Sequence, residues 1–175
     1  LSLNEPINVT TYSIESRIEF PLPNTDYHNV IASGNSYGEN DNNSGADHFL
    51  AIQNNGNITV YTPGNCDTCG WHGEFNTNDL IGWHTITVKS DAELNTSIFY
   101  LNGNPVDTIN FAVNGDIEYI GNYTPNYFNG NQWIGKMDYL KIWDSNSIDQ
   151  SINCCDCVDD NLIAFWPFEE NFIDT

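Results

Sequence analysis

The chain has 175 residues, 39% of them apolar, and it carries 24 acidic residues against only four basic ones, a net charge of −20. This apolar share suffices for the core of one domain, so we do not expect the whole chain to be disordered. A field this negative repels phosphate backbones and anionic lipid surfaces, and no stretch approaches the roughly 18 apolar residues of a spanning helix. We therefore expect no nucleic-acid partner and no membrane insertion.

The first predicted element is a strand over residues 12–20. Its sequence, YSIESRIEF, alternates apolar residues with charged ones, which is the period of a strand buried on one face. Only Ser16 breaks this alternation. The face predicted to be buried comprises Tyr12, Ile14, Ile18 and Phe20, and the opposite face Glu15, Arg17 and Glu19.

The loop that follows, SYGENDNNSGAD, predicts a calcium site. Glu39, Asp41 and Asp47 lie within it, beside glycines that free backbone carbonyls for a cation that needs six to eight oxygen ligands. The spacing is not that of an EF-hand. The negative field of the whole chain also concentrates divalent cations, so Ca²⁺ is the expected structural ion.

Two hairpins are predicted next. The segments HFLAIQ and ITVYT are joined by residues 54–57 (NNGN), and SIFYL and PVDTI by residues 102–104 (NGN). Asn-Gly pairs suit the positive φ angles of hairpin turns. Between the hairpins, HTITVKS alternates as a further strand, so the chain predicts an all-β antiparallel sandwich or barrel.

The most unusual segment is GNCDTCGWHGEF, residues 64–75. Its Cys66-x-x-Cys69 spacing recurs as Cys154-x-x-Cys157, which leaves three chemistries open: disulfides, a four-thiolate zinc site, or a redox centre. Cysteines in an acidic, lysine-poor chain indicate an oxidising compartment. We expect Cys66 and Cys69 to be bridged, and we expect one further bridge among Cys154, Cys155 and Cys157, with one thiol left over.

A loop stiffened in this way is suited to holding Trp71 outside the core. Lectin sites pair an aromatic platform with amide or carboxylate groups, which predicts a ligand site at Trp71, His72 and Asn76. The alternative is that Trp71 only covers a sheet edge. Secondary ligand candidates are the aromatic residues of Gly/Asn-rich loops, namely Tyr37, Tyr127 and Trp133.

Three longer segments carry a resemblance to a known family. They are TTYSIESRIEFPLP, LIGWHTITVKSDAELNTSIFYLNGNPVDT, and IEYIGNY followed by FNGNQWIGKMDYLKIWDSNSID. In this order they resemble laminin G-like domains of the concanavalin A-like lectin and glucanase superfamily, over about residues 8–150. The resemblance implies a jelly-roll β-sandwich of two curved antiparallel sheets, commonly with calcium, that binds glycans or proteins. It also implies that Asp138 approaches the calcium ion.

The domain expected from this resemblance spans residues 1–153. Residues 154–175 are a Cys-rich segment followed by NLIAFWPFEENFIDT, which resembles the first strand of the family. This strand either completes the sandwich or begins a following domain.

The sequence predicts a non-catalytic function. The superfamily's glucanases carry E-x-D-x-x-E or E-x-D-x-E on one strand, and neither pattern is present. We expect an extracellular recognition module that binds a glycan or a cell-surface glycoprotein, with neighbouring domains in the same polypeptide. The alternatives are a structural or protein-binding spacer of an adhesin, and a glycoside hydrolase.

Overall fold

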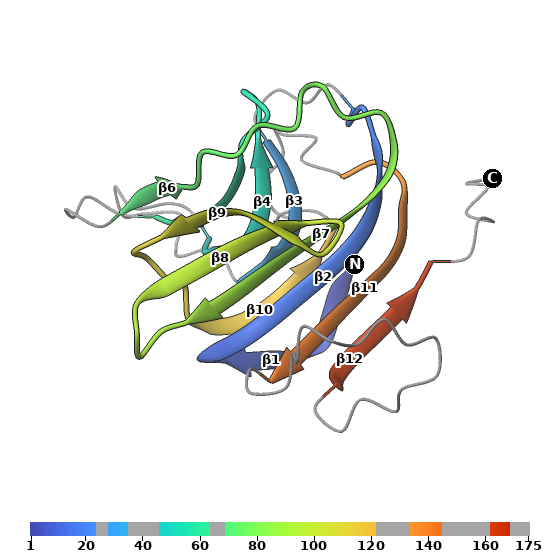
Figure 1. Cartoon of the computed structure of the whole chain (residues 1–175). Coiled ribbons are helices and arrows are strands. Elements are labelled where there is room, and N and C mark those ends of the chain that lie inside the picture. Colours follow the sequence, from blue (N-terminus) through green and yellow to red (C-terminus); the bar gives the residue numbers. More distant parts are fainter. Residues whose placement is uncertain (24–27, 35–45, 64–68, 122–133, 145–161, 169–175) are drawn as a thin grey trace.

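The structure is a computed structural model that describes residues 1–23, 28–34, 46–63, 69–121, 134–144 and 162–168. In these ranges every regular element is a β-strand, and the strands form two antiparallel sheets (Figure 1). None of these residues belongs to a helix long and apolar enough to cross a membrane. The prediction of an all-β, antiparallel jelly-roll sandwich is confirmed.

Each sheet has six strands among the described residues. Sheet A follows the order β1 (Ser2–Val9), β10 (Gly115–Ile120), β3 (His28–Ser33), β4 (His48–Gln53), β5 (Ile58–Thr62) and β6 (Gly70–His72). Sheet B follows the order β12 (Leu162–Pro167), β11 (Met137–Asp144), β2 (Thr11–Phe20), β7 (Gly82–Asp91), β8 (Thr96–Leu101) and β9 (Asn104–Ile109). The edge strands β6 and β9 lie side by side at the left of Figure 1.

The core lies between the two sheets and follows the period of two seen in the sequence. In β2, Ile14 and Ile18 are fully buried, whereas Glu15 and Arg17 lie on the outer face. The facing strands of sheet A contribute Phe49, Leu50 and other fully buried apolar side chains. Each sheet therefore has an outer face that takes no part in this core.

Ser16, the residue that breaks the pattern of β2, also lies on the buried face. Its hydroxyl Oγ donates a hydrogen bond of 3.0 Å to the backbone carbonyl of Tyr139 on β11. A buried hydroxyl is tolerated here because its hydrogen bond is made.

The predicted turn between β8 and β9 is confirmed. Asn102 and Gly103 both have positive φ angles, 49° and 78°. The Asn102 side chain also accepts a hydrogen bond from the backbone N–H of Thr85, at 2.9 Å, and so ties the turn to β7.

The late strand β12 pairs antiparallel with β11 at the edge of sheet B. Its alternate residues Ala164 and Trp166 pack against the core, while Ile163 and Phe165 are 48% and 49% exposed. The boundary predicted at residues 153 and 154 lies outside the described residues and stays a prediction.

Candidate functional site

Trp71 lies at the centre of the three-residue edge strand β6. Thr62, Tyr61 and Val60 of β5 pair with Gly70, Trp71 and His72 respectively. The flanking residues Gly70 and Gly73 have φ angles of 122° and 133°, which side chains rarely adopt. A residue with a side chain would be strained at either position, so glycine suits both.

The Trp71 indole belongs to an aromatic cluster made of His28, His48, Tyr61 and Trp71, on the outer face of sheet A. Its ring centroid is 4.5 Å from that of Tyr61, 4.5 Å from that of His28 and 5.6 Å from that of His48. Four strands, β3 to β6, each contribute one ring. Register in the sheet therefore brings together side chains that are far apart in the sequence.

Beneath this aromatic cluster lies a small apolar patch separate from the main core. Trp71 packs against it, and its members are the buried residues Val30, Ala46 and Ala51. Trp71 is half-buried as a result. The indole thus covers the sheet, as one interpretation of the sequence proposed, and still presents part of its surface outward.

The two histidines of the aromatic cluster are neutral at physiological pH. Their Nε2 atoms lie 3.1 Å apart, so one ring donates and the other accepts. Burial lowers the pKa of His28 to about 4. Burial, followed by the proximity of His28, lowers the pKa of His48 to about 3. Two protonated rings at this distance would repel, which agrees with the direction of both shifts.

A groove of about 550 Å³ opens between β6 and β9 beside the aromatic cluster. Trp71 and His72 line one side of it, and Asp107, Thr108 and Ile109 of β9 line the other. The His72 ring stacks on Phe111 with centroids 3.9 Å apart, which fixes its position. The remaining lining residues are Asn57, Gly73 and Glu74. The groove combines aromatic surface with amide, hydroxyl and carboxylate groups.

The two carboxylates of this groove differ in their bonding. Asp107 accepts backbone N–H groups through both oxygens, from Glu74 at 2.7 Å and from Thr108 at 2.8 Å. This bond from Glu74 joins the edges of the two sheets. The Glu74 side chain is exposed. Asp107 therefore holds the groove together, and Glu74 is the carboxylate that is accessible from solvent.

Asn76, predicted to contact a ligand, lies in the loop after β6, where its side chain supports Asn57. Its Nδ2 donates to the Asn55 carbonyl at 2.8 Å and to the Asn57 side-chain oxygen at 3.0 Å. Its own oxygen accepts the backbone N–H of Asn78 at 2.9 Å. Asn57, which lines the groove, is thus held by Asn76.

Of the four acidic residues predicted to hold calcium, the structure describes Asp47 and Asp138. Asp138 lies 2.7 Å from the Arg17 guanidinium, and this ion pair accounts for its position without a metal. Asp47 is half-buried, and burial raises its pKa, an environment that an added cation would relieve. The described ranges contain no group of three or more residues suited to a metal, and Glu39 and Asp41 lie outside them.

Several predicted residues lie outside the part of the chain that the structure describes. These are the ligand candidates Tyr37, Tyr127 and Trp133, and the cysteines Cys66, Cys154 and Cys157. Cys69, which is described, is disulfide-bonded. Its pairing with Cys66 stays a prediction.

Sequence reasoning missed three members of the aromatic cluster, His28, His48 and Tyr61. His28 and His48 are 20 positions apart in the sequence, and their rings meet across the neighbouring strands β3 and β4 although the two residues are not partners in the register. The one signal in the sequence is a pair of histidines at the starts of two apolar strands.

Comparisons with known proteins give the fold a context. No protein-family model matches the chain, and no curated protein matches it. Several solved structures, however, superpose on the chain. The Ruminococcus gnavus IT-sialidase CBM40 superposes with a TM-score of 0.55 at 15% identity, over 84% of this chain and 94% of that one. The fold that the two chains share is a jelly-roll β-sandwich.

Two further solved structures agree with this fold. A heptameric SAP-like pentraxin from Limulus polyphemus has a TM-score of 0.52 at 19% identity, over 81% of this chain and 68% of that one. A Bacteroides ovatus protein proposed to bind carbohydrate has a TM-score of 0.60 at 14% identity, over 95% of this chain and 47% of that one. At these identities the likeness concerns the fold alone.

Proposed function

We propose that this chain is a non-catalytic glycan-binding module of the laminin G-like type, working outside the cell in a larger secreted or surface protein. The observation that carries the proposal is the groove between β6 and β9, which is lined by Trp71 and the fixed His72 on one side and by polar groups of β9 on the other. Sugars offer apolar C–H faces and hydroxyl groups, and this combination of rings, amides and carboxylates suits both.

The superposed structures support a glycan as the partner. The Ruminococcus gnavus CBM40 was solved bound to α2,6 and to α2,3 sialyllactose, with TM-scores of 0.52 and 0.51 to this chain. The groove described here contains Glu74 and Asp107 and no basic residue. Its own charge therefore favours a neutral sugar, because an acidic one would meet two carboxylates.

The bonding of Asp107 argues against hydrolysis in this groove. A glycosidase needs two carboxyl groups, one of them free to take and release a proton. Both Asp107 oxygens are engaged by backbone N–H groups, so this carboxylate has a structural role, and Glu74 has no second free carboxyl group beside it in the groove. Release of reducing ends from a polysaccharide by the purified domain would overturn this part of the proposal.

Substitution of Trp71 tests the proposed groove. Because the indole supplies the sugar platform and also packs on sheet A, Trp71→Ala should both weaken glycan binding and lower stability. Trp71→Phe keeps a ring against Tyr61 and should reduce affinity for a neutral glycan by about 1–2 kcal/mol, the scale of one aromatic contact, with little unfolding. A glycan array identifies the ligand, and calorimetry measures the loss.

Trp166→Phe is the matched control. This half-buried tryptophan of β12 packs on the core and lies in the other sheet. The same change of side chain there should leave glycan affinity unaltered. If Trp71→Phe and Trp166→Phe bind equally well, the groove is not the site. If no glycan binds while the fold is intact, the spacer alternative is favoured.

A further inference from the structure

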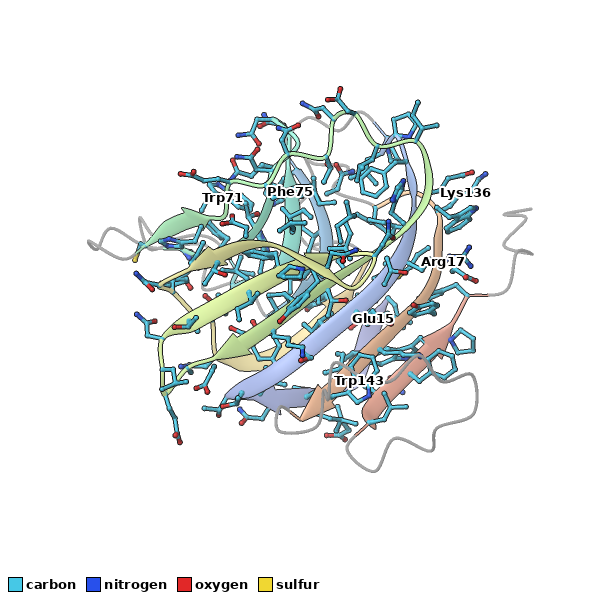
Figure 2. All side chains as sticks on the ribbon, viewed as in Figure 1. Glu15, Arg17, Trp71, Phe75, Lys136 and Trp143 are labelled. Atoms are coloured by element: carbon cyan, nitrogen blue, oxygen red, sulfur yellow. The ribbon has the colours of Figure 1, made fainter. Side chains whose placement is uncertain are left out.

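The basic residues of this chain are concentrated on one surface. The sequence holds only four of them, in a chain with 24 acidic residues. Arg17, Lys89 and Lys141 all lie on the outer face of sheet B, and Lys136 lies at one end of it, where it pairs with the outward Glu19. Figure 2 shows Glu15 and Arg17 along β2, with Trp143 on the neighbouring β11, far from Trp71.

Lys141 stands among aromatic rings on this face. Its ammonium Nζ is 5.0 Å from the ring centroid of Tyr139, 5.7 Å from that of Trp143 and 5.7 Å from that of Phe165. Cation–π attraction holds an ammonium in such a position. Within the described part of the chain no carboxylate forms a salt bridge with Lys141. The rings thus fix a positive charge in place.

The absence of that salt bridge has a structural cause. Glu15 lies directly opposite Lys141 in the β2–β11 register and would be its natural partner. Both Glu15 oxygens instead accept hydroxyl groups, from Tyr139 at 2.9 Å and from Thr87 at 3.2 Å. Burial, followed by the nearby Glu15 charge, raises the pKa of Tyr139 to about 12, so the phenol keeps the proton that it donates.

Arg17 follows Glu15 on the outer face of β2, and it also combines a cation with a nearby aromatic ring. Its guanidinium lies 5.5 Å from the Trp83 ring centroid and 2.7 Å from Asp138. The side chains of Arg17 and Asp138 are 45% and 40% exposed. An exposed ion pair of this kind is weak, so another carboxylate can replace Asp138 at the guanidinium.

We propose that the outer face of sheet B is a second binding site, for a saccharide that bears a carboxylate. Lys141 and Arg17 would bind the acid group, and the neighbouring rings of Trp83 and Phe165 would pack on the C–H faces of the sugar. Phe165 is 49% exposed and so is available for this contact. The site is independent of the Trp71 groove, whose carboxylates repel an acidic ligand.

The rings favour a sugar over an acidic peptide at this face. A peptide that satisfied the two cations would leave several aromatic faces without a matching flat apolar surface, whereas pyranose rings supply one beside each carboxylate. A glutamate-rich peptide is included in the test, because binding of it at equal affinity would overturn the assignment to sugars.

Titration calorimetry with two pairs of probes tests the site. Trigalacturonate is compared with its methyl ester, and sialyllactose with lactose, on the wild-type domain and on variants. We expect at least one acidic probe to bind at least about tenfold more tightly than its uncharged counterpart, and Lys141→Gln to abolish this preference. Raising the salt concentration should lower the affinity for the acidic probe but not the affinity for its uncharged counterpart.

Lys136→Gln is the matched control, since it removes the same charge five positions before Lys141 on the chain, about 16 Å away in an extended strand. It should reduce the affinity less than twofold, roughly, if only distant charge is lost. Equal losses in the two variants, or no preference for acidic probes, would overturn the proposal. Trp71→Phe should leave acidic binding intact, so failure of the groove and failure of this face are distinguishable.

Discussion

Backbone geometry at two glycines determines how Trp71 is presented. Gly70 and Gly73 flank the Trp71-His72 pair with φ angles of 122° and 133°. A Cβ added at Gly70 would meet nothing within 4 Å, whereas one added at Gly73 would collide with the backbone carbonyl of Ile58. The two positions share an unusual backbone conformation but differ in the space around them.

Alanine substitutions at these positions should separate strain from collision. Gly70→Ala should cost about 1–2 kcal/mol through backbone strain alone. Gly73→Ala should cost more, roughly 3 kcal/mol or above, because β5 must also shift. Urea unfolding of both variants measures the difference. Equal destabilisation would mean that the contact with Ile58 is relieved without cost.

The sequence marked Trp71 and His72 as ligand candidates but did not predict their surroundings. Flanking glycines and two cysteines mark the segment as unusual from local composition alone. Asn76 was predicted to contact a ligand and Asn57 was not considered, but Asn57 lines the groove and Asn76 holds it there through a hydrogen bond between loops. Such bonds depend on positions in space that residue spacing does not encode.

At the scale of elements, the pair formed by His28 and His48 connects β3 and β4 beneath Trp71. Both folded-state pKa values lie well below the ordinary histidine value, at about 4 and about 3, because the rings are buried. The unfolded chain therefore binds more protons than the folded one between these values and about 6.5. Stability from this pair is complete above that range and is lost as the pH falls.

This linkage predicts a loss of stability on acidification. For the buried His48, lowering the pH from 7 to 5 should reduce the free energy of unfolding by about 2 kcal/mol. The raised pKa of Asp47 acts in the opposite direction. Comparison with a variant isolates the histidine contribution: His48→Gln should show a smaller loss between pH 7 and pH 5 in urea unfolding.

His84→Gln is the control for this experiment. His84 is a half-buried histidine of β7 that contacts Phe20 and lies outside the aromatic cluster. Its replacement leaves the His28–His48 pair in place, so the contribution of that pair to acid sensitivity should be retained. If His48→Gln and His84→Gln respond alike to pH, the histidine pair does not control the acid sensitivity of this face.

Local elements were predictable from the sequence, but their order in the sheets was not. The alternation of apolar and polar residues predicted which faces of β2 and β7 are buried, and the Asn-Gly pair predicted the turn between β8 and β9. Strand β2, however, pairs with β11 and β7, so that Arg17, Thr85 and Tyr139 become neighbours from three distant segments. The pairing of β11 with its neighbours also places the aromatic rings around Lys141. Periodicity within a single strand does not determine which strands pair.

At the scale of the whole molecule, charge is distributed unevenly. The groove between β6 and β9 contains carboxylates, while the outer face of sheet B holds most of the few cations. With a net charge of −20, the remaining surface repels itself and attracts counter-ions. Any salt should therefore stabilise the domain somewhat by screening, and a specific ion must be distinguished from that general effect.

Calcium bound at the Asp47 loop should stabilise the domain beyond such screening. The half-buried Asp47 carboxylate, whose pKa is raised by burial, gains a partner when the ion binds. Calcium at about 100 times its Kd should add about 2.7 kcal/mol, or about 5–10 °C in Tm for a domain of this size. Calorimetric scans with calcium, magnesium and sodium chloride at equal ionic strength measure the specific part. Asp47→Asn should abolish the rise in Tm that is specific to calcium. Asp138→Asn should retain this rise, because Asp138 pairs with Arg17. Loss of the calcium shift only in Asp138→Asn would instead locate the ion where the family resemblance implied, and equal shifts with all three salts would reduce the effect to screening.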